Sequence, residues 1–365
     1  MIAPDIRYMT LALGLAGRGL GNVWPNPAVG CVIVHEGRIV GRGWTQPGGR
    51  PHAETVALAQ AGEAARGATA YVTLEPCAHH GQTPPCADAL ITAGVSRVVV
   101  AAQDPDPRVD GGGIERLKAA GIEVVTGLLQ DPAERLNAGF IQRVTQGRPF
   151  VTLKLANSFD GRIATATGDS KWITGPEARR WVHGLRARHD AVLVGGGTAR
   201  GDDPSLTVRD LGVARQPVRV VWSRLLDFPL AGKLAATAAD LPVWICHGRD
   251  ADHGLRQVWQ GLGARLFEVS VGRGRQVDPA GALQMLAEAG LTRVFCEGGG
   301  SLAASLLGAG LVDELVGFTA GVALGAEGRP SVGAMGIDRL AEAPRFRLAE
   351  SRGIGGDVMH RWVRN

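Results

Sequence analysis

The sequence lacks the features that mark membrane proteins, secreted scaffolds and nucleic-acid-binding proteins. It has no run of about 18 apolar residues, which excludes an ordinary membrane-spanning helix. No basic segment followed by an apolar one stands near Met1, so we expect no signal peptide and a cytoplasmic protein. The net charge is only +4, aromatic residues make up 5% of the chain, and no Lys/Arg block occurs. We therefore expect neither a nucleic acid nor a membrane as partner.

Cysteine is scarce and odd in number, with 5 residues in a chain of 365. A chain of this length does not need disulfides to hold a core, so we expect reduced thiols. Cys31, Cys246 and Cys296 lie in apolar stretches typical of strands, and we expect each to be a buried structural thiol. Cys77 and Cys86 each follow a proline instead.

The length predicts two domains, because one domain usually holds about 100–200 residues. The turn-rich stretch Gln146-Gly147-Arg148-Pro149 separates two halves, so we expect domains at 1–146 and 147–365. Strand patterns alternate with helix patterns in both halves, which predicts an α/β fold and, in the first half, a largely parallel sheet covered on its faces.

The expected elements follow from the apolar periodicity of each segment. In the first half we expect helices at 5–17, 53–65, 85–93 and 113–120 and strands at 28–35, 70–75, 97–102 and 122–128. In the second half we expect strands at 150–156, 190–194, 217–222, 241–246, 293–296 and 314–319 and helices at 176–188, 279–289 and 301–308. Segments 345–351 and 357–363 alternate enough to form an antiparallel pair.

Three residues at predicted helix and strand ends indicate a zinc site. His52 precedes one helix, Cys77 follows a strand, and Cys86 begins the next helix. One imidazole and two thiolates suit Zn²⁺ and leave a fourth position for water. Backbone N–H groups at helix starts favour the thiolate form of cysteine.

Glu54 stands two residues after His52, a spacing that suits a general acid/base acting beside the metal. Zinc deaminases combine His-x-Glu with Pro-Cys-x-x-Cys, whereas the spacing from Cys77 to Cys86 is longer here. One alternative is a structural zinc site, for which His79 or His80 would supply the fourth ligand, and another is a set of unlinked core residues.

The first half closely resembles the deaminase half of the bifunctional riboflavin biosynthesis deaminase/reductase family. The segments that carry the resemblance are Pro25-Asn26-Pro27-Ala28-Val29-Gly30, His52-Ala53-Glu54, the stretch 76–86 and Asp104-Pro105-Asp106-Pro107. The resemblance implies a cytidine-deaminase-like three-layer domain, with His52, Cys77 and Cys86 as ligands of one zinc ion and Glu54 as proton shuttle. The side-chain amide of Asn26 offers a donor and an acceptor to a base edge, and the alternative is that Pro-Asn-Pro is only a rigid turn.

The second half contains two glycine-rich turns that follow strand patterns. One is Gly195-Gly196-Gly197-Thr198, and the other is Glu297-Gly298-Gly299-Gly300-Ser301, which opens an apolar helix. A strand, a glycine turn and a helix start can bind phosphate through free backbone N–H groups. Neither turn fits the dinucleotide fingerprint, and tight packing explains a glycine run nearly as well.

This half resembles the reductase domain of the same family through Lys154-Leu155-Ala156, Asp160-Gly161-Arg162, Trp172-Ile173-Thr174, Leu206-Thr207-Val208-Arg209 and Glu297-Gly298-Gly299. The resemblance implies a dihydrofolate-reductase-like α/β domain that uses NADPH. It assigns a cofactor-lining role to Ala156, Trp172, Thr198, Asp202, Gly298, Gly299 and Gly300. It assigns substrate contacts to Lys154, Ser170, Arg186, Leu206, Arg209 and Glu297.

Guanidinium groups bind phosphate in a bidentate way, which suits Arg186 and Arg209. The alternative for Arg186 is a solvated helix face shared with the arginines at 179, 180 and 188. Reduction of a ribose carbon needs a proton source, and Lys154, Asp202 and Glu297 are the candidates.

Taken over nearly the whole chain, the resemblance implies deamination of a diaminopyrimidine ribosylamine phosphate, followed by NADPH-dependent reduction of its ribosyl group. The partner is then a small-molecule pyrimidine ribosylamine phosphate, and family resemblance suggests a homo-oligomer. One rival is a nucleoside or nucleic-acid base deaminase fused to an unrelated oxidoreductase. Another is a non-catalytic, zinc-stabilised scaffold with a closed four-ligand site.

Overall fold

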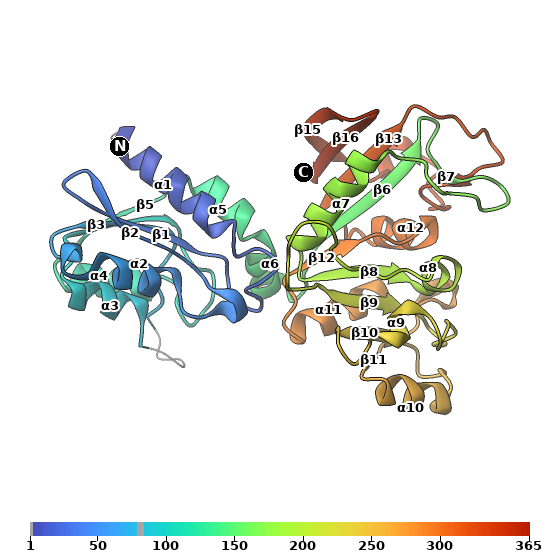
Figure 1. Cartoon of the computed structure of the whole chain (residues 1–365), viewed down its shortest axis with the longest axis horizontal. Coiled ribbons are helices and arrows are strands. Elements are labelled where there is room, and N and C mark those ends of the chain that lie inside the picture. The colour runs from blue at the N-terminus through green and yellow to red at the C-terminus, as the bar shows by residue number, and fades with distance from the viewer. Residues whose placement is uncertain (1–2, 79–83) are drawn as a thin grey trace. The chain divides into compact units, whose positions relative to one another are not determined.

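The chain folds into two compact units, Met1–Arg148 and Pro149–Asn365. The computed structural model describes residues 3–78 and 84–365 (Figure 1). The units divide between Arg148 and Pro149, whereas the sequence places the boundary after Gln146. Within the described residues, no helix is both long and apolar enough to cross a membrane.

The first unit is built on a five-stranded sheet with the order β2-β1-β3-β4-β5. Strand β1 pairs antiparallel with both β2 and β3, and only β3, β4 and β5 run parallel. The expectation of a largely parallel sheet is therefore wrong at this edge, because a strand that the sequence did not reveal, β2, forms a hairpin with β1. The strands are β1 (Gly30–His35), β2 (Arg38–Trp44), β3 (Thr69–Leu74), β4 (Arg97–Ala102) and β5 (Glu123–Thr126).

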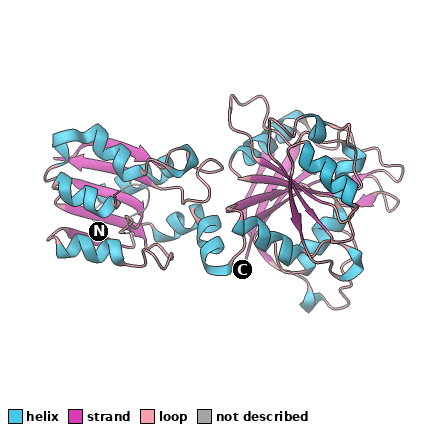
Figure 2. Ribbon diagram, turned by 90° about the horizontal axis from the view of Figure 1, so that it is seen from below, coloured by secondary structure: helices cyan, strands magenta, loops and turns pink. Residues whose placement is uncertain are grey.

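Helices cover both faces of this sheet and complete a three-layer α/β unit (Figure 2). Helices α1 and α5 lie on one face, and α2, α3 and α4 lie on the other (Figure 1). The helices are α1 (Ala3–Ala16), α2 (Ala53–Ala61), α3 (Cys86–Ala93), α4 (Gly112–Ala119), α5 (Gln130–Leu136) and α6 (Ala138–Gln146). The predicted helix 53–65 ends as an α-helix at Ala61 and continues as a short 3₁₀ turn.

The glycines of β2 let α2 approach the sheet closely. A β-carbon on Gly43 would lie 2.0 Å from the carbonyl oxygen of Ala53, and one on Gly41 would lie 2.2 Å from that of Ala57. No side chain fits at such distances, so the first turn of α2 rests directly on the strand. This packing fixes the position of His52, which precedes that turn, and of Glu54, which lies in it.

The second unit contains a nine-stranded sheet with the order β11-β10-β9-β8-β12-β6-β13-β16-β15. The strands from β11 to β13 pair in parallel, and β16 and β15 extend the sheet as an antiparallel hairpin, which confirms the predicted closing pair. The large strands are β6 (Phe150–Ser158), β8 (Ala191–Gly195), β9 (Val218–Trp222), β10 (Val243–His247), β11 (Arg265–Glu268), β12 (Arg293–Cys296), β13 (Glu314–Ala320), β15 (Phe346–Ile354) and β16 (Asp357–Arg364).

The chain order changes direction at the centre of this sheet, where β12 inserts between β8 and β6. In open α/β sheets, ligands bind beyond the carboxyl ends of strands at such a switch point. Two short strands, β7 (Arg162–Ala164) and β14 (Arg329–Pro330), form a separate pair. The helices are α7 (Pro176–Ala187), α8 (Gly196–Asp202), α9 (Lys233–Ala236), α10 (His253–Gly261), α11 (Pro279–Glu288) and α12 (Gly300–Gly308).

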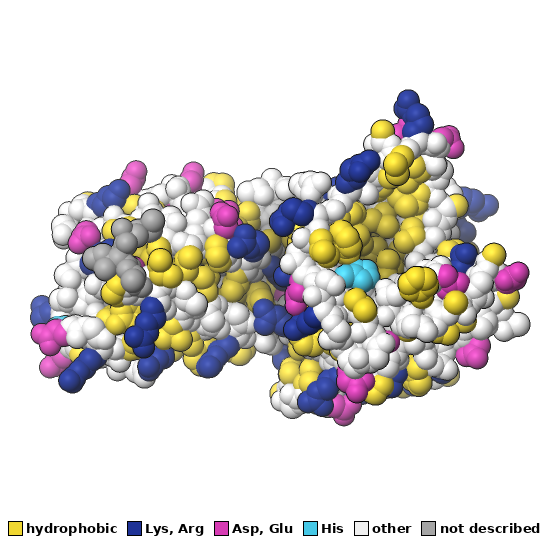
Figure 3. Space-filling model, turned by 90° about the horizontal axis from the view of Figure 1, so that it is seen from above, with side chains coloured by type: hydrophobic (Ala, Val, Ile, Leu, Met, Phe, Trp, Pro, Cys, Tyr) yellow, Lys and Arg dark blue, Asp and Glu magenta, His cyan; other side chains and the backbone are white. Residues whose placement is uncertain are grey.

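Helix α7 packs on one side of the β13–β16 pair, against Val316, Phe318 and Met359. Because side chains alternate along a strand, Leu315, His360 and Trp362 point to the opposite side. They line a cavity of about 270 Å³ there, together with Leu155 and other residues. Hydrophobic side chains gather around a histidine in a hollow on one face of this unit (Figure 3).

Candidate functional site

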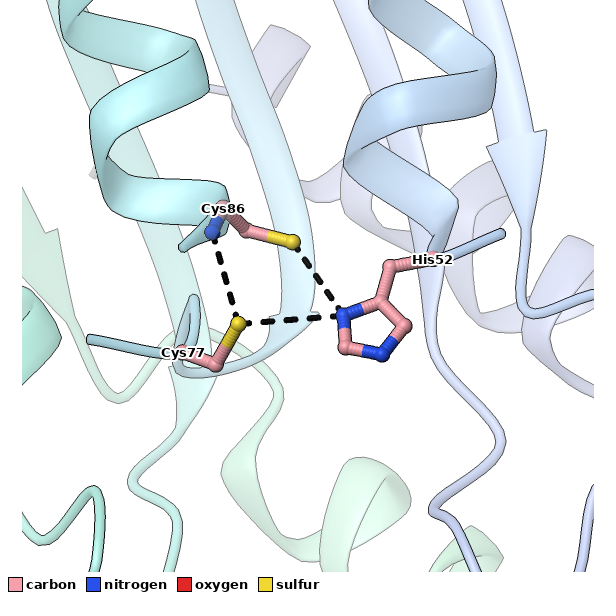
Figure 4. Close-up of side chains that lie close together, drawn as sticks. All are labelled: His52, Cys77 and Cys86. Atoms are coloured by element: carbon pink, nitrogen blue, oxygen red, sulfur yellow. Dashed lines mark hydrogen bonds between the residues drawn. The ribbon is translucent and has the colours of Figure 1, made fainter. Parts of the chain in front are cut away.

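Three sequence-predicted ligands converge in the first unit. His52 is the residue before α2, Cys77 follows β3, and Cys86 is the first residue of α3 (Figure 4). The ligand atoms of the three side chains all lie within 4.8 Å of one another. The carboxyl end of a strand and the starts of two helices therefore bring together residues that lie 34 positions apart.

The spacing of these atoms fits a zinc ion. His52 Nδ1 lies 3.2 Å from Cys86 Sγ and 3.7 Å from Cys77 Sγ. With Zn–S of about 2.3 Å and Zn–N of about 2.0 Å, ligand atoms on a tetrahedral ion lie roughly 3.5–3.8 Å apart. His79 and His80, which the sequence offers as a fourth ligand, lie outside the described residues.

The protonation of the two thiols is unequal. Hydrogen bonds from Cys86 and His52 lower the pKa of the Cys77 thiol to about 4, and the Cys86 backbone N–H donates to Cys77 Sγ at 3.3 Å. The hydrogen bond to Cys77 and the burial of its own side chain raise the pKa of Cys86. Because zinc binds cysteine as thiolate, metal binding at this site would release protons.

Glu54 lies in the first turn of α2 with only 3% of its surface exposed. Burial raises the pKa of its carboxyl to about 7, although the neighbouring His52 opposes this shift. A carboxyl with a pKa near neutrality can both take up and release a proton, which is the requirement for a general acid/base.

A cavity of about 280 Å³ opens beside these residues. His52, Glu54 and Cys77 lie in its wall, as does Asn26. Asn26 also belongs to a turn, because its backbone N–H donates to the carbonyl of Val23 at 3.0 Å. The two interpretations of Asn26 are thus compatible in this fold.

The cavity wall also contains residues that the sequence did not single out as site residues. Asp104, Asp106 and Arg108 come from the segment after β4, and Arg143 comes from α6. Asp104 and Asp106 belong to the Asp-Pro-Asp-Pro motif, which supports the family resemblance but to which the sequence assigned no role in the site. Their position at the carboxyl end of a parallel strand beside β3 is the signal that could have identified them.

In the second unit, Lys154, Arg186 and Glu297 form a buried ion-paired cluster. Arg186 Nε donates to Glu297 Oε1 at 2.5 Å, and Lys154 Nζ lies 3.8 Å from Glu297 Oε2. Burial alone would raise the pKa of the Glu297 carboxyl, yet Arg186 and Lys154 hold it below its ordinary value. The Arg186 side chain is 13% exposed, so it does not share a solvated helix face with the other arginines of α7.

The segment after α8 meets the same cluster. Arg186 donates to the carbonyl of Thr207 at 2.7 Å, and Leu206 beside it is buried. The backbone N–H of Arg209 donates to Nδ1 of His183 at 3.2 Å, and His183 lies on α7 one turn before Arg186. The sequence did not predict His183 as a site residue, because a lone histidine on a helix belongs to no recognisable motif.

The two glycine turns lie next to each other at the carboxyl ends of β8 and β12. A β-carbon on Gly299 would be 3.8 Å from Thr198 Oγ1, and Leu302 packs against both Gly195 and Gly298. Gly299 precedes α12, whose first residue is Gly300. This arrangement is the strand, turn and helix start that the sequence predicts.

The remaining sequence-predicted residues are placed differently. Ala156 packs on the core beneath α7. Ser170, Trp172 and Asp202 are exposed, and the Arg179 guanidinium lies 4.6 Å from the ring of Trp172. The described contacts therefore unite Lys154, Arg186, Leu206, Arg209 and Glu297, but they do not bring these exposed residues to that cluster.

Each unit matches a known sequence family. The cytidine and deoxycytidylate deaminase zinc-binding region matches residues 3–102, and the RibD C-terminal domain matches residues 149–360. The chain belongs to the RibD family.

RibD proteins resemble the chain over its length. The riboflavin biosynthesis protein RibD of Escherichia coli is 43% identical, covering 97% of this chain and 98% of that protein, and RibD of Aquifex aeolicus is 42% identical, covering 97% of both. A solved structure of Acinetobacter baumannii RibD has a TM-score of 0.88 at 41% identity and covers 99% of both chains. A Thermotoga maritima diaminohydroxyphosphoribosylaminopyrimidine deaminase/5-amino-6-(5-phosphoribosylamino)uracil reductase has a TM-score of 0.87 at 34% identity, with 99% of both chains covered. The sequence predicts a deaminase-like first unit and a reductase-like second unit. The family models and the RibD structure match the same two units.

Proposed function

We propose that the chain is a bifunctional deaminase and reductase of riboflavin biosynthesis. Its first unit deaminates 2,5-diamino-6-ribosylamino-4(3H)-pyrimidinone 5′-phosphate by hydrolysis, and its second unit reduces the ribosyl group of the product to ribityl with NADPH. The observation that carries this proposal is the convergence of His52, Cys77 and Cys86 beside Glu54 on one cavity, in a chain of the RibD family.

His52, Cys77 and Cys86 would hold one zinc ion, since their donor atoms are those that zinc prefers and their spacing fits it. A bound zinc ion lowers the pKa of a water molecule and so supplies a strong nucleophile near neutral pH. Three protein ligands would leave the fourth position of the ion for a water molecule, as in catalytic zinc sites.

Glu54 would move the proton. Its carboxylate accepts a proton from the attacking water, and the carboxylic acid then donates that proton to the departing amino nitrogen, which leaves as ammonia. The pKa of about 7 suits both halves of this transfer, because neither protonation state is strongly favoured. Asn26 offers a donor and an acceptor to the edge of the pyrimidine ring.

In the second unit, Arg209 would bind the substrate phosphate. Arg186 donates two hydrogen bonds to Glu297 and one to Thr207 O, so it would hold Glu297 in the substrate site beside Leu206. Ser170 keeps the substrate contact that the resemblance implies. Bound NADPH supplies the hydride for the reduction. The residues that would line the cofactor are Ala156, Trp172, Thr198, Asp202 and the turn 298–300. Of these, Thr198 and the turn are adjacent at the switch point of the sheet. Lys154 is the favoured proton source among the three candidates, because burial lowers the pKa of its ammonium group while Glu297 holds it in place.

Two rivals predict different features. An unrelated oxidoreductase in the second half is incompatible with the match of residues 149–360 to the RibD C-terminal domain. A non-catalytic scaffold has no need for a buried carboxyl of raised pKa beside the metal ligands, where Glu54 lies.

We also propose that the chain forms a homo-oligomer through the apolar side of β13, β15 and β16. Leu348 and Val358 are 46% and 47% exposed there, and the half-buried Leu315 and Trp362 lie on the same side. An apolar patch of this kind on a soluble protein usually marks an interaction surface.

The test is an assay of the zinc-loaded protein with the diaminopyrimidine ribosylamine phosphate, with and without NADPH. We expect ammonia release without NADPH, and NADPH oxidation only after that release. The variant Glu54→Gln should lose ammonia release by at least about 100-fold, because general acid/base catalysis contributes that much. It should still reduce the pre-deaminated substrate at the wild-type rate.

The matched control is Glu63→Gln, which makes the same change in the 3₁₀ turn that follows α2. It should leave both reactions unchanged. If the zinc-loaded wild type releases no ammonia, the deaminase assignment is wrong and the scaffold interpretation replaces it.

A further inference from the structure

Glu75 is a buried carboxylate to which the proposed chemistry gives no role. It follows β3 directly, two residues before Cys77, and it is 4% exposed. Its carboxylate accepts four backbone hydrogen bonds. Oε1 accepts from Gly113 at 2.9 Å and Ile114 at 3.2 Å, and Oε2 accepts from Asp104 at 3.3 Å and Gly111 at 3.1 Å.

The two oxygens hold different parts of the chain. Oε1 binds the first turn of α4, where free N–H groups at a helix start favour a negative charge. Oε2 binds the two ends of the segment 104–111, which joins β4 to that helix. A single carboxylate therefore closes the segment into a fixed loop between the end of one strand and the start of one helix.

That loop forms one wall of the cavity that holds Glu54. Its residues Asp104, Asp106, Arg108 and Val109 all line the cavity. Within the loop, Asp104 Oδ1 accepts from the backbone N–H of Asp106 at 2.9 Å, and the Arg108 guanidinium pairs with the Asp106 carboxylate. These local bonds give the loop its shape, and Glu75 fixes that shape relative to β3.

The loop and the metal ligand Cys77 also share a support. A β-carbon on Gly113 would lie 1.9 Å from the carbonyl oxygen of Pro76, so the start of α4 packs directly on the peptide before Cys77. A displacement of α4 would therefore change the distance between the loop wall and the metal ligands. Glu75 is the charged group that opposes such a displacement.

We propose that Glu75 is a positioning residue that sets the affinity of the deaminase site for its substrate by holding the loop 104–111 against the end of β3. It does not react, because a carboxylate accepts about four hydrogen bonds and backbone donors already occupy that number. This inference rests on the proposed deaminase function of the first unit.

The variant Glu75→Gln tests the proposal. The amide keeps one acceptor oxygen and places an NH₂ group against two backbone N–H donors. Two of the four hydrogen bonds are therefore lost, and repulsion between donors replaces them. We expect the KM for deamination to rise roughly tenfold, because the loop wall that faces the substrate is no longer held in one position. The kcat should stay within about twofold of wild type, since Glu54 and the ligands keep their places.

Two measurements accompany the KM. Zinc content by atomic absorption should remain one ion per chain, and reduction of the pre-deaminated substrate should be unchanged. The matched control is Glu115→Gln, which alters an exposed carboxyl in the first turn of the same helix. It should leave KM and kcat as in wild type.

A second variant, Glu75→Asp, keeps both oxygens and the charge but shortens the reach, so its KM should lie between those of wild type and Glu75→Gln. If the amide variant does not yield folded protein, a KM of Glu75→Asp above that of wild type still tests the proposal. Loss of zinc from either variant, a fall in kcat at unchanged KM, or kinetics equal to the control would each overturn the proposal. An inactive wild type would instead contradict the deaminase function itself.

Discussion

Asp5 shows at the residue scale how one carboxyl joins three elements of the first unit. It lies on α1, accepts two hydrogen bonds from Arg97 on β4 at 3.0 and 3.2 Å, and accepts another from Tyr71 on β3 at 2.7 Å. The hydrogen bonds from Arg97, followed by that from Tyr71, lower the pKa of Asp5 below its ordinary value of 3.8, although burial opposes them. The ionised form therefore stabilises the folded unit.

We predict that Asp5→Asn lowers the free energy of unfolding of the first unit by about 1–3 kcal/mol at pH 7. In the unfolded chain the pKa of Asp5 returns to about 3.8, so its contribution is complete above that value and is lost as the pH falls through the lower pKa of the folded state. The difference between wild type and variant should thus shrink below about pH 4.

Urea unfolding at pH 7 and pH 3, with a chelator present so that metal release does not contribute, measures this difference. The control is Asp131→Asn on α5, because the Asp131 side chain is 83% exposed and its distance to Arg135 is 4.0 Å. It should change the free energy of unfolding by less than about 0.5 kcal/mol at either pH. A cost of Asp5→Asn that does not depend on pH would show that the carboxyl acts through packing alone.

The sequence predicts the proposed zinc ligands and proton shuttle more readily than the residue proposed to support them. His52, Glu54, Cys77 and Cys86 stand in segments that resemble the zinc-binding half of a known family, and the structure brings these residues together. Glu75 carries no such signal, because its partners are backbone N–H groups of residues 29–39 positions away. Backbone donors have no side-chain identity that a sequence can display.

At the element scale, the contact between β2 and α2 makes a prediction about packing. A β-carbon on Gly43 would lie 2.0 Å from Ala53 O and 2.7 Å from Ala57 N, both backbone atoms that move only with the whole helix. We expect Gly43→Ala to lower the free energy of unfolding of the first unit by about 1–3 kcal/mol through overpacking. It should also reduce deamination, because the first turn of α2 carries Glu54.

Gly14→Ala is the matched control, since a β-carbon at Gly14 on α1 meets nothing within 4 Å. Alanine stabilises a helix relative to glycine by about 0.5–1 kcal/mol, so this variant should be slightly more stable than wild type and fully active. Thermal unfolding and ammonia release measure both variants. Equal behaviour of the two would show that α2 can move away from β2 without consequence.

The two glycines of β2 explain why the sequence pattern did not predict this strand. Arg38-Ile39-Val40-Gly41-Arg42-Gly43-Trp44 contains two glycines, which lower strand propensity and favour turns in a sequence pattern. Their presence reflects the helix above them, a contact between elements that local periodicity does not contain. Buried strands such as β3 and β4 need no such partner-specific residues, and there the predicted 70–75 and 97–102 agree with Thr69–Leu74 and Arg97–Ala102.

The proposed oligomer predicts that a charge placed in its interface weakens self-association. Leu348 lies opposite Trp362 in the β15–β16 ladder, on the apolar side of the hairpin. A charge at that position would have to be buried in the proposed interface without a partner. We therefore expect Leu348→Lys to shift the protein toward the monomer, with an apparent Kd for self-association at least about tenfold weaker.

Light scattering coupled to gel filtration over a range of concentrations measures the shift. Leu340→Lys is the control, because Leu340 is 79% exposed in a short 3₁₀ turn and does not line the apolar cavity. It should leave the mass unchanged. A wild type that is monomeric at all concentrations would contradict the proposed interface.

Strand β6 is synthesised long before the strands with which it pairs. It opens the second unit but pairs with β12 and β13, and the backbone N–H of Val151 donates to Asp313, 162 residues further along. At about 5–20 residues per second, a ribosome needs roughly 10–30 s to supply that partner. The first unit can complete its sheet during this interval, while β6 is still an unpaired strand. A growing chain should therefore gain its two active sites one after the other, and the waiting strand is the place where chaperones would bind first.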